Sequence, residues 1–310
     1  RMAANVQTEL ARRRLQEVSS QLDPEFVEDL LHAPQLTEHD LQSQQHRVKE
    51  LQTKLADMEQ TPAVRDLMSV ADHLLRRSVW IIGGDGWAYD IGSSGVDHVL
   101  ASGRDVNVLV LDTEVYSNTG GQASKSTPLG AVAKFASAGK PTAKKDMALP
   151  AIAYGSVYVA RVALGADPQQ TLRAFREAEA YPGPSLIIAY SHCIAHGYDL
   201  RNGLDQQYKA VHCGHWPLMR YNPVLADEGR NPFLLDSPKP DETWREYTKL
   251  ELRYRMLQKA HPEEAERLLD LGQRQVERRY AEYAEMASRT AENFAVDARM
   301  SEFAASSNRA

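Results

Sequence analysis

The chain has 310 residues, of which 43% are hydrophobic and 25% charged, and its formal net charge is −6. This composition is typical of a globular protein with one substantial core, and the dispersed basic residues argue against a nucleic-acid-binding surface. No apolar run approaches the ~20 residues that a membrane-spanning helix needs, so we expect no membrane partner.

The chain contains two cysteines, Cys193 and Cys213. Two thiols are too few for a disulfide framework, which indicates a reducing compartment and, by default, the cytosol. No apolar segment follows the first residues, so we predict no secretory signal. Because the chain begins with Arg1 and not with methionine, we also expect that it has been processed or is a piece of a longer chain.

The first zone, up to about residue 77, is predicted to be helical. Asp23 precedes Pro24, which suits the first position of a helix, and Thr37 with Asp40 resembles a capping box. Apolar residues then recur every seven positions, at Leu41, Val48 and Leu55 and at Leu51 and Met58. This spacing predicts one apolar stripe facing a partner, as in a helical hairpin packed on a core.

The second zone alternates strand and helix, and its strands are continuous apolar runs. The predicted strands are Val79–Ile82, Val106–Leu111, Val157–Leu164 and Leu186–Ala189, and the predicted helices between them are Gly95–Ala101 and Pro168–Ala180. Such runs are typical of strands that are buried on both faces. The pattern predicts an α/β fold with a mostly parallel sheet flanked by helices, whose ligands bind at the carboxyl ends of the strands.

The third zone is predicted to be peripheral. It begins with a Pro- and Asn-rich meander from Trp216 to Pro240 and continues in charged helices from Glu242 to Arg289, with the last twenty or so residues expected to fray. We therefore divide the chain into a helical segment at 1–77, an α/β core at 78–215 and a meander with a helical extension at 216–310.

Two motif blocks follow the first two predicted strands. Asp85 lies between Gly84 and Gly86 after the first strand, and Thr113 lies in the second block, 28 residues later. This separation leaves room for one helical crossover between the two strands. Glycine permits a positive φ and leaves no Cβ in the way, so Asp85 can approach a divalent cation closely. The Thr113 hydroxyl and the Val115 carbonyl add the hard oxygen ligands that Mg²⁺ prefers, so the blocks predict a magnesium-diphosphate site.

Glycines in both blocks are predicted to aid anion binding. Gly84 and Gly86 in the first block, and Gly120 and Gly121 in the second, let backbone N–H groups face phosphate oxygens at a loop or helix N-terminus.

Together the blocks resemble the thiamine-diphosphate motif, with threonine where most thiamine enzymes have asparagine. The segments Gly84–Gly92, Asp112–Gln122 and Ser185–Cys193 are similar to those of the pyruvate:ferredoxin (flavodoxin) oxidoreductase family. The resemblance runs from about residue 20 to residue 290 and covers only the C-terminal part of such an enzyme.

The resemblance implies the roles of the site residues. Asp85, Thr113 and Val115 would hold Mg²⁺, and Gly84, Gly86, Trp87 and Gly120 would contact thiamine diphosphate. Asn118 would stand in the active centre near pyruvate. Two aromatic residues of the blocks, Trp87 and Tyr116, could instead be packing residues.

Cys193 has two interpretations. A lone cysteine after a strand is usually a small hydrophobic residue, but the resemblance implies that Cys193 is one of the four ligands of a [4Fe-4S] cluster. The other ligands would precede this chain, which cannot hold the cluster alone. A zinc site could be imagined from Cys213, its neighbours His212 and His215, and His192 and His196. Its spacing is not that of usual zinc ligands and the resemblance implies no zinc here, so we expect Cys213 to be a neutral substitution in a surface segment.

The activity that the resemblance implies is the oxidative decarboxylation of pyruvate with coenzyme A to acetyl-CoA and CO₂, with ferredoxin or flavodoxin as the electron acceptor. The full-length enzyme would be a homodimer. The isolated chain is expected to be inactive, because no segment matches the family's pyrimidine-binding domain. The alternatives are an oxidoreductase for another 2-oxoacid, a thiamine decarboxylase without clusters, and an inactive fragment that serves as an assembly module.

Overall fold

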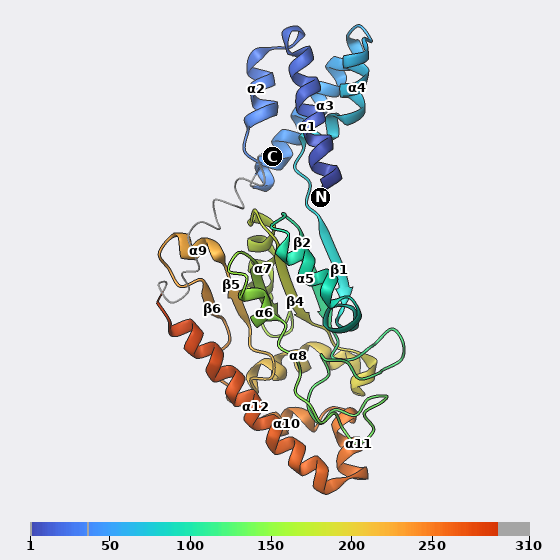
Figure 1. Ribbon diagram of the computed structural model, residues 1–310, viewed down its shortest axis with the longest axis vertical. Helices are drawn as coiled ribbons and strands as arrows, with labels where there is room; N and C mark the ends of the chain where they lie inside the picture. Colours follow the sequence, from blue (N-terminus) through green and yellow to red (C-terminus); the bar gives the residue numbers. More distant parts are fainter. Residues whose placement is uncertain (1, 36, 291–310) are drawn as a thin grey trace. The chain divides into compact units, whose positions relative to one another are not determined.

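A computed structural model describes residues 2–35 and 37–290. The last twenty residues, for which we predicted fraying, lie outside the described residues. The chain divides into two compact units, the first ending at Val79 and the second beginning at Trp80 (Figure 1).

The first unit is helical, as predicted. Its elements are α1 (Met2–Val18), η1 (Ser19–Gln21), α2 (Pro24–His32), α3 (Glu38–Asp57), α4 (Pro62–Val70) and η2 (Ala71–Leu74). The Asp23 side chain accepts from the Phe26 backbone N–H at 3.0 Å and caps α2. Thr37 and Asp40 form a reciprocal capping box at the start of α3, which confirms that prediction.

The apolar stripe of α3 faces the core of this unit. Val48, Leu51 and Leu55 are buried, whereas Leu41 and Met58 are half-buried. They pack with the apolar residues of the other helices, among them Ala11, Leu15, Leu30, Val64, Leu67 and Leu74. The first unit therefore has a hydrophobic core of its own.

The second unit contains one six-stranded sheet. Its strands are β1 (Trp80–Gly84), β2 (Asn107–Asp112), β3 (Tyr158–Val162), β4 (Ser185–Tyr190), β5 (Met219–Tyr221) and β6 (Phe233–Leu235). Their order is β1-β2-β4-β3-β5-β6, in which the first four run parallel and the last two pair antiparallel. The prediction of a mostly parallel sheet in an α/β fold is confirmed.

Helices and short turns connect these strands. They are η3 (Gly86–Ile91), α5 (Ser93–Ala101), α6 (Ala148–Ile152), α7 (Pro168–Ala180), η4 (Ile194–His196), η5 (Leu200–Asn202), α8 (Gly203–His212), α9 (Pro223–Asp227), α10 (Trp244–Thr248), α11 (Leu252–Ala260) and α12 (Pro262–Ser288). Among the described helices, none combines the length and the apolar character that a membrane span requires.

The two faces of the sheet are covered differently. Val108, Val110 and Ile188 point into a large core shared with α5, α6, α8, α10 and α12. On the other face, Ala160 and Ile187 pack against α7. Both faces of the central strands are thus buried, which explains why their sequences are continuous apolar runs.

The third zone differs from the prediction. The expected meander contains β5 and β6, which belong to the same sheet as the motif strands, and the charged helical stretch is broken into α10, α11 and α12.

Cys213 was predicted to lie in a surface segment, and this is wrong, because the residue is buried at the end of α8. The domain division itself stays a prediction.

Close packing between α10 and α12 generates a prediction. A Cβ at Gly272 of α12 would overlap the indole ring of Trp244, which is fully buried. Gly272→Ala should therefore destabilise the fold by about 1 to 3 kcal/mol, although alanine favours helices. Gly95 of α5 is the matched control, because nothing lies within 4 Å of the Cβ position there.

Gly95→Ala should stabilise the fold by up to about 1 kcal/mol. Urea unfolding of both variants measures the difference. Equal effects of the two substitutions would contradict the close α10–α12 contact.

Candidate active site

Three neighbouring parallel strands end at the same edge of the sheet. Asp85 directly follows β1, Thr113 directly follows β2, and Cys193 follows β4 after two intervening residues. Because β1 pairs with β2 and β2 pairs with β4, all three side chains belong to one edge. This edge is where open parallel sheets bind ligands.

The first motif block forms a π-helix instead of a glycine turn. Asp85 has φ −64° and caps η3, and neither Gly84 nor Gly86 has a positive φ, so that part of the prediction is wrong. Gly86 is required for a different reason, because a Cβ there would overlap the Tyr116 ring. π-Helical segments are rare and often occur at functional sites.

Trp87 has a packing role in this segment. Its ring lies where a Cβ on Gly83 or on Gly92 would be, so both glycines make room for it. The ring also packs against the large core of the second unit. The packing alternative for Trp87 and Tyr116 is therefore supported by direct contacts, and the assignment of Trp87 to a diphosphate cradle stays a prediction.

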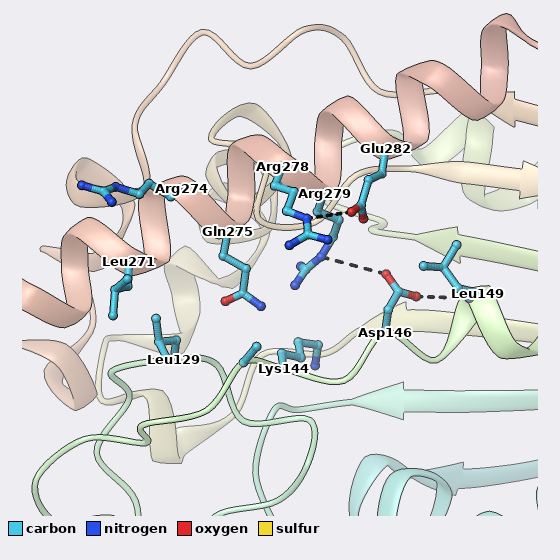
Figure 2. Close-up of a pocket in the computed structure, with 11 residues that line it drawn as sticks. Leu129, Lys144, Asp146, Leu149, Leu271, Arg274, Gln275, Arg278, Arg279 and Glu282 are labelled. Atoms are coloured by element: carbon cyan, nitrogen blue, oxygen red, sulfur yellow. Dashed lines mark hydrogen bonds and ion pairs between the residues drawn. The ribbon is translucent and has the colours of Figure 1, made fainter.

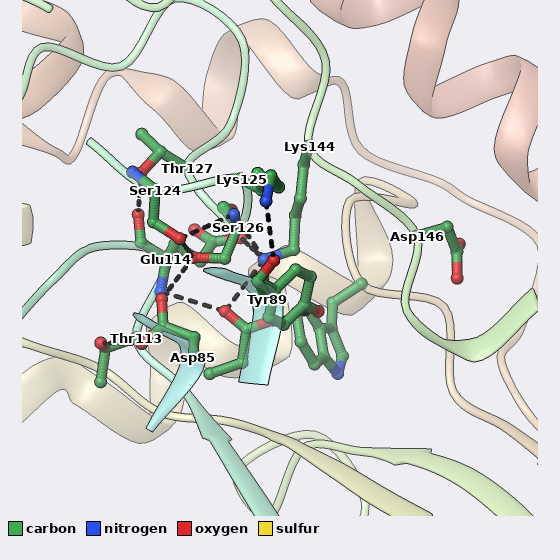
Figure 3. A network of polar contacts seen from close by, with 12 residues as sticks. Asp85, Tyr89, Thr113, Glu114, Ser124, Lys125, Ser126, Thr127, Lys144 and Asp146 are labelled. Atoms are coloured by element: carbon green, nitrogen blue, oxygen red, sulfur yellow. Dashed lines mark hydrogen bonds and ion pairs between the residues drawn. The ribbon is translucent and has the colours of Figure 1, made fainter. Parts of the chain in front are cut away.

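Asp85 is the centre of a cluster of oxygen atoms (Figure 3). Its carboxylate accepts from the Thr113 hydroxyl at 2.9 Å, from the Val115 backbone N–H at 2.8 Å and from the Ser126 hydroxyl. The Thr113 hydroxyl also lies 3.0 Å from the Val115 carbonyl oxygen. The structure thus brings together the three residues that the sequence assigned to a cation.

The charge of Asp85 is compensated only in part, because Lys144 lowers its pKa less than burial and Asp112 raise it. The side chain is 2% exposed, and among the described residues no ion pair includes it. Burial, followed by repulsion from Asp112, raises the pKa of Asp85 to about 6. A buried carboxylate next to a hydroxyl and a carbonyl oxygen is a set of hard donors that fits Mg²⁺.

Two further carboxylates of the second block are buried beside Asp85, and both have cations. Asp112 accepts from the Lys144 ammonium group at 2.8 Å and from the Tyr89 hydroxyl at 2.7 Å. Glu114 accepts from Arg253 at 2.7 Å and contacts His215 at 2.7 Å. Sequence reasoning missed these contacts.

The environment of Glu114 favours its ionised form. Burial alone would raise the pKa of Glu114, but the neighbouring His215, Lys144 and Arg253 hold it well below its usual range. Glu114 also has φ +61°, which is unusual for a residue with a side chain. Such strain is found at functional sites.

The rest of the second block is a loop. Gly120 has φ +103° and Gly121 has φ +93°, as glycine permits, and their N–H groups donate to Ser117 and Tyr116 within the loop. Asn118 lies at the exposed tip of the loop. The roles predicted for Asn118 and Gly120 remain predictions.

Cys193 lies next to this loop. Its thiol is 6% exposed and its sulfur lies 3.3 Å from the Ser117 hydroxyl oxygen. The sulfur also accepts from the Ala195 N–H at 3.5 Å, at the start of η4. The end of β4 is thereby tied to the residue before Asn118.

Among the described residues, no group of three or more His, Cys, Asp or Glu residues is placed to hold a metal ion. The histidines and Cys213 contact other groups instead. The His196 ring nitrogen Nε2 lies 2.7 Å from the Thr113 carbonyl oxygen, and Cys213 lies 3.5 Å from the Ala210 carbonyl oxygen.

A cavity of about 490 Å³ lies between α12 and the segment before α6 (Figure 2). None of the predicted site residues lines it. Three of the four positive charges that face it have carboxylate partners, because Arg278 pairs with Glu282, Arg279 lies 3.9 Å from Asp146, and Lys144 pairs with Asp112. We assign no ligand to this cavity.

Comparison with known proteins identifies the chain's relatives. Residues 67–189 match the family described as thiamine pyrophosphate enzyme, C-terminal TPP binding domain. The chain is 52% identical over 290 residues to a putative pyruvate-flavodoxin oxidoreductase of Synechocystis, and 51% identical over 294 residues to a pyruvate-flavodoxin oxidoreductase of Nostoc. The chain belongs to the pyruvate:ferredoxin (flavodoxin) oxidoreductase family.

These alignments cover 94% and 93% of this chain but 24% of each relative, so the chain spans about a quarter of the length of these family members. A pyruvate:ferredoxin oxidoreductase of Moorella thermoacetica is 55% identical over 72% of this chain and 19% of its own length. Among solved structures, a 2-oxoglutarate:ferredoxin oxidoreductase from Magnetococcus marinus aligns with 37% of this chain and 40% of its own, at 24% identity and a TM-score of 0.35. This last overlap supports no argument about the site.

The buried imidazole of His196 generates a prediction about acid stability. Burial lowers the pKa of His196 to about 4, so the folded state keeps the ring neutral over a range where the unfolded state binds a proton. The contribution of His196 to the free energy of unfolding is therefore fully present at pH values above ~6.5, the pKa of histidine in the unfolded chain, and it is lost as the pH falls towards 4. Between pH 7 and pH 4.5 this loss should be about 2 kcal/mol.

The measurement is urea unfolding at both pH values for the wild type and for His196→Gln, whose amide can still donate to the Thr113 carbonyl. Asp85, with its raised pKa, opposes the trend but is present in both proteins, so it cancels in the comparison. The variant should lose about 2 kcal/mol less than the wild type on acidification. An equal loss would contradict a neutral buried His196.

Proposed function

We propose that this chain is the thiamine-diphosphate- and magnesium-binding part of an enzyme that oxidises pyruvate with coenzyme A to acetyl-CoA and CO₂. The names of its relatives state pyruvate as the substrate and flavodoxin or ferredoxin as the partner. The observation that carries the proposal is the oxygen cluster of Asp85, Thr113 and Val115 at the ends of β1 and β2. In the intact enzyme, electrons would pass to ferredoxin or flavodoxin.

In this proposal Asp85, Thr113 and the Val115 carbonyl hold Mg²⁺. The ion would supply the positive charge that the buried carboxylate of Asp85 lacks, and it would in turn hold the diphosphate of the cofactor. Gly84, Gly86, Trp87 and Gly120 would line the diphosphate. Thiamine diphosphate, when bound, supplies an electron sink for the decarboxylation of the oxoacid.

The protein's contribution is placement. Asn118 would reach the substrate from the exposed tip of the loop, while the contacts of Val115 with Asp85 and of Ser117 with Cys193 limit the movement of the segment that precedes it. A fixed cofactor next to a fixed polar side chain reduces the entropy cost of reaching the reactive geometry. We name no general base, because no segment of the sequence matches the pyrimidine-binding domain that supplies it in the family.

We propose that Cys193 is one ligand of a [4Fe-4S] cluster whose other ligands belong to another part of the longer protein. A thiol at this position would place the cluster beside Ser117 and thus beside the active loop. Both cysteines are free, which is consistent with a reducing compartment such as the cytosol.

Exposed apolar side chains near the site support the view that other parts of the enzyme cover it. Ile82, Ile91 and Ile194 are 62%, 82% and 80% exposed, and they lie on β1, at the end of η3 and directly after Cys193. We propose that the chain by itself is inactive and that the full-length enzyme is a homodimer. The same site would also serve another 2-oxoacid, since substrate choice depends partly on residues outside this chain.

Removal of the Asp85 charge tests the metal site. In the full-length enzyme that contains this chain, Asp85→Asn should weaken Mg²⁺-dependent binding of thiamine diphosphate by at least about 10-fold, because the hard anionic ligand is lost. Calorimetric titration of the apo-enzyme measures this affinity. Asp97→Asn is the control, since it removes the same charge from the remote hydrogen bond to Tyr154.

The control should retain wild-type affinity. Unchanged binding in Asp85→Asn would contradict the proposed metal site, and absence of any binding by the wild type would contradict the proposed function as a whole.

Removal of the Cys193 thiol tests the cluster. In the full-length enzyme, Cys193→Ala should lower the content of iron and acid-labile sulfide by about one [4Fe-4S] cluster, because such a cluster needs four thiolates. Cys213→Ala is the matched control, since Cys213 is equally buried but contacts a backbone carbonyl within α8. Equal cluster content in the two variants would overturn the role of Cys193.

A further inference from the structure

The metal-binding loop depends on the backbone of Glu114. This residue lies between Thr113 and Val115 and has φ +61°, a left-handed conformation that disfavours residues with a Cβ. The turn at Glu114 allows the Thr113 hydroxyl and the Val115 N–H to bond to the same carboxylate, that of Asp85. A relaxed backbone at this position would separate these two groups.

The side chain of Glu114 is held in the core. It is fully buried, and its two oxygen atoms have different partners. One oxygen lies 2.7 Å from Nε2 of His215, and the other accepts from the Arg253 guanidinium group at 2.7 Å. Because the carboxylate cannot leave the core without losing these contacts, it restrains the strained backbone to which it belongs.

Arg253 is the charged partner that is itself fixed in place. Its Nε donates to Glu251 at 2.5 Å, and Glu251 accepts in turn from Gln206 and from the Tyr247 hydroxyl, each at 2.9 Å. All of these side chains are buried. By contrast, Lys144 lies 3.6 Å from Glu114 and is bonded to Asp112 at 2.8 Å.

We propose that Arg253, at the start of α11, is a positioning residue for the magnesium site: its pairing with Glu114 holds residues 113–115 in the conformation that presents Thr113 and the Val115 carbonyl beside Asp85. Arg253 touches neither Asp85 nor Thr113 and acts only through Glu114. The inference rests on the proposed function of the site. It gives α11, which follows the sheet in the chain, a part in cofactor binding.

A purely structural role for Arg253 makes a different prediction. If Arg253 only stabilised the fold, its loss would resemble the loss of any other buried arginine with carboxylate partners. Arg220 on β5 is such a residue, since it is 6% exposed and bonds to Asp236 at 2.8 Å and to Glu177. Arg220→Met is therefore the matched control for Arg253→Met.

The first measurement is hydrogen–deuterium exchange of the metal-free, full-length enzyme. The Val115 amide donates to Asp85, so its exchange rate reports on the loop without any ligand. Arg253→Met should accelerate exchange in the peptide that covers residues 113–116 by about 10-fold, and Arg220→Met should leave it unchanged. Urea unfolding of both variants compares their losses of stability.

The second measurement is the affinity of the same enzymes for Mg²⁺ in the presence of thiamine diphosphate, by calorimetry. Arg253→Met should weaken Mg²⁺ binding by about 10-fold, and Arg220→Met by less than about 2-fold. Arg253→Lys keeps the charge but loses the fork that bridges Glu114 and Glu251, so it should give an intermediate value.

The outcomes separate the two hypotheses. Unchanged loop exchange in Arg253→Met, or equal effects of Arg253→Met and Arg220→Met, would overturn the positioning role. If the wild type bound no Mg²⁺, the proposed function would fail, and the exchange experiment would still decide whether Arg253 holds the loop. Should Arg253→Met fail to fold, Glu114→Gln removes the same ion pair with little change in volume and must give the same faster exchange.

Discussion

Charge balance in a buried site is the constraint on which this structure depends. Three carboxylates, Asp85, Asp112 and Glu114, lie with almost no solvent exposure at the ends of β1 and β2. Lys144 compensates Asp112 and Arg253 compensates Glu114, whereas Asp85 has hydrogen bonds but no ion pair among the described residues, and Lys144 offsets its charge only in part. Burial without a full counter-charge is costly for a carboxylate, and burial together with repulsion from Asp112 raises the pKa of Asp85 to about 6. In the proposed enzyme the magnesium ion completes the balance.

The compensating cations come from segments far from the motif. Lys144 precedes α6, and Arg253 lies 139 residues after Glu114, in α11. Helix α12 packs into the same large core as β2 and β4, and it lies beside β6 and α10 (Figure 1). The region after the sheet's parallel strands is therefore part of the structure that supports the site and not an appendage to it.

The sequence predicts those parts of the site whose residues form a recognisable pattern within a short stretch of the chain. Asp85, Thr113 and the capping residues have signatures within a few positions, and the parallel strands are apolar runs, so both could be predicted. The pairing of Glu114 with Arg253 has no such signature, because two buried charges distant in sequence follow no periodicity. The strands β5 and β6 have three residues each, too short for a pattern. For Gly86 the sequence suggested a positive φ, whereas the structure requires glycine because the Tyr116 ring occupies the space of a Cβ. Tyr116 follows β2, so this contact has no local signature in the first block.

The proposed magnesium site and the proposed iron–sulfur ligand Cys193 both contact the same loop, so the position of this loop would affect both. Residues 113–115 are tied to Asp85 and, through the Glu114 carboxylate, to Arg253, and four residues after Thr113 the Ser117 hydroxyl lies 3.3 Å from the Cys193 sulfur. Asn118 follows directly and is exposed. Movement of the loop would therefore disturb the proposed metal ligands and the proposed cluster ligand together. A loop restrained at both contacts would keep the distance between the proposed metal and cluster sites constant while its exposed tip remained available, which is the arrangement that the proposed decarboxylation followed by electron transfer would require.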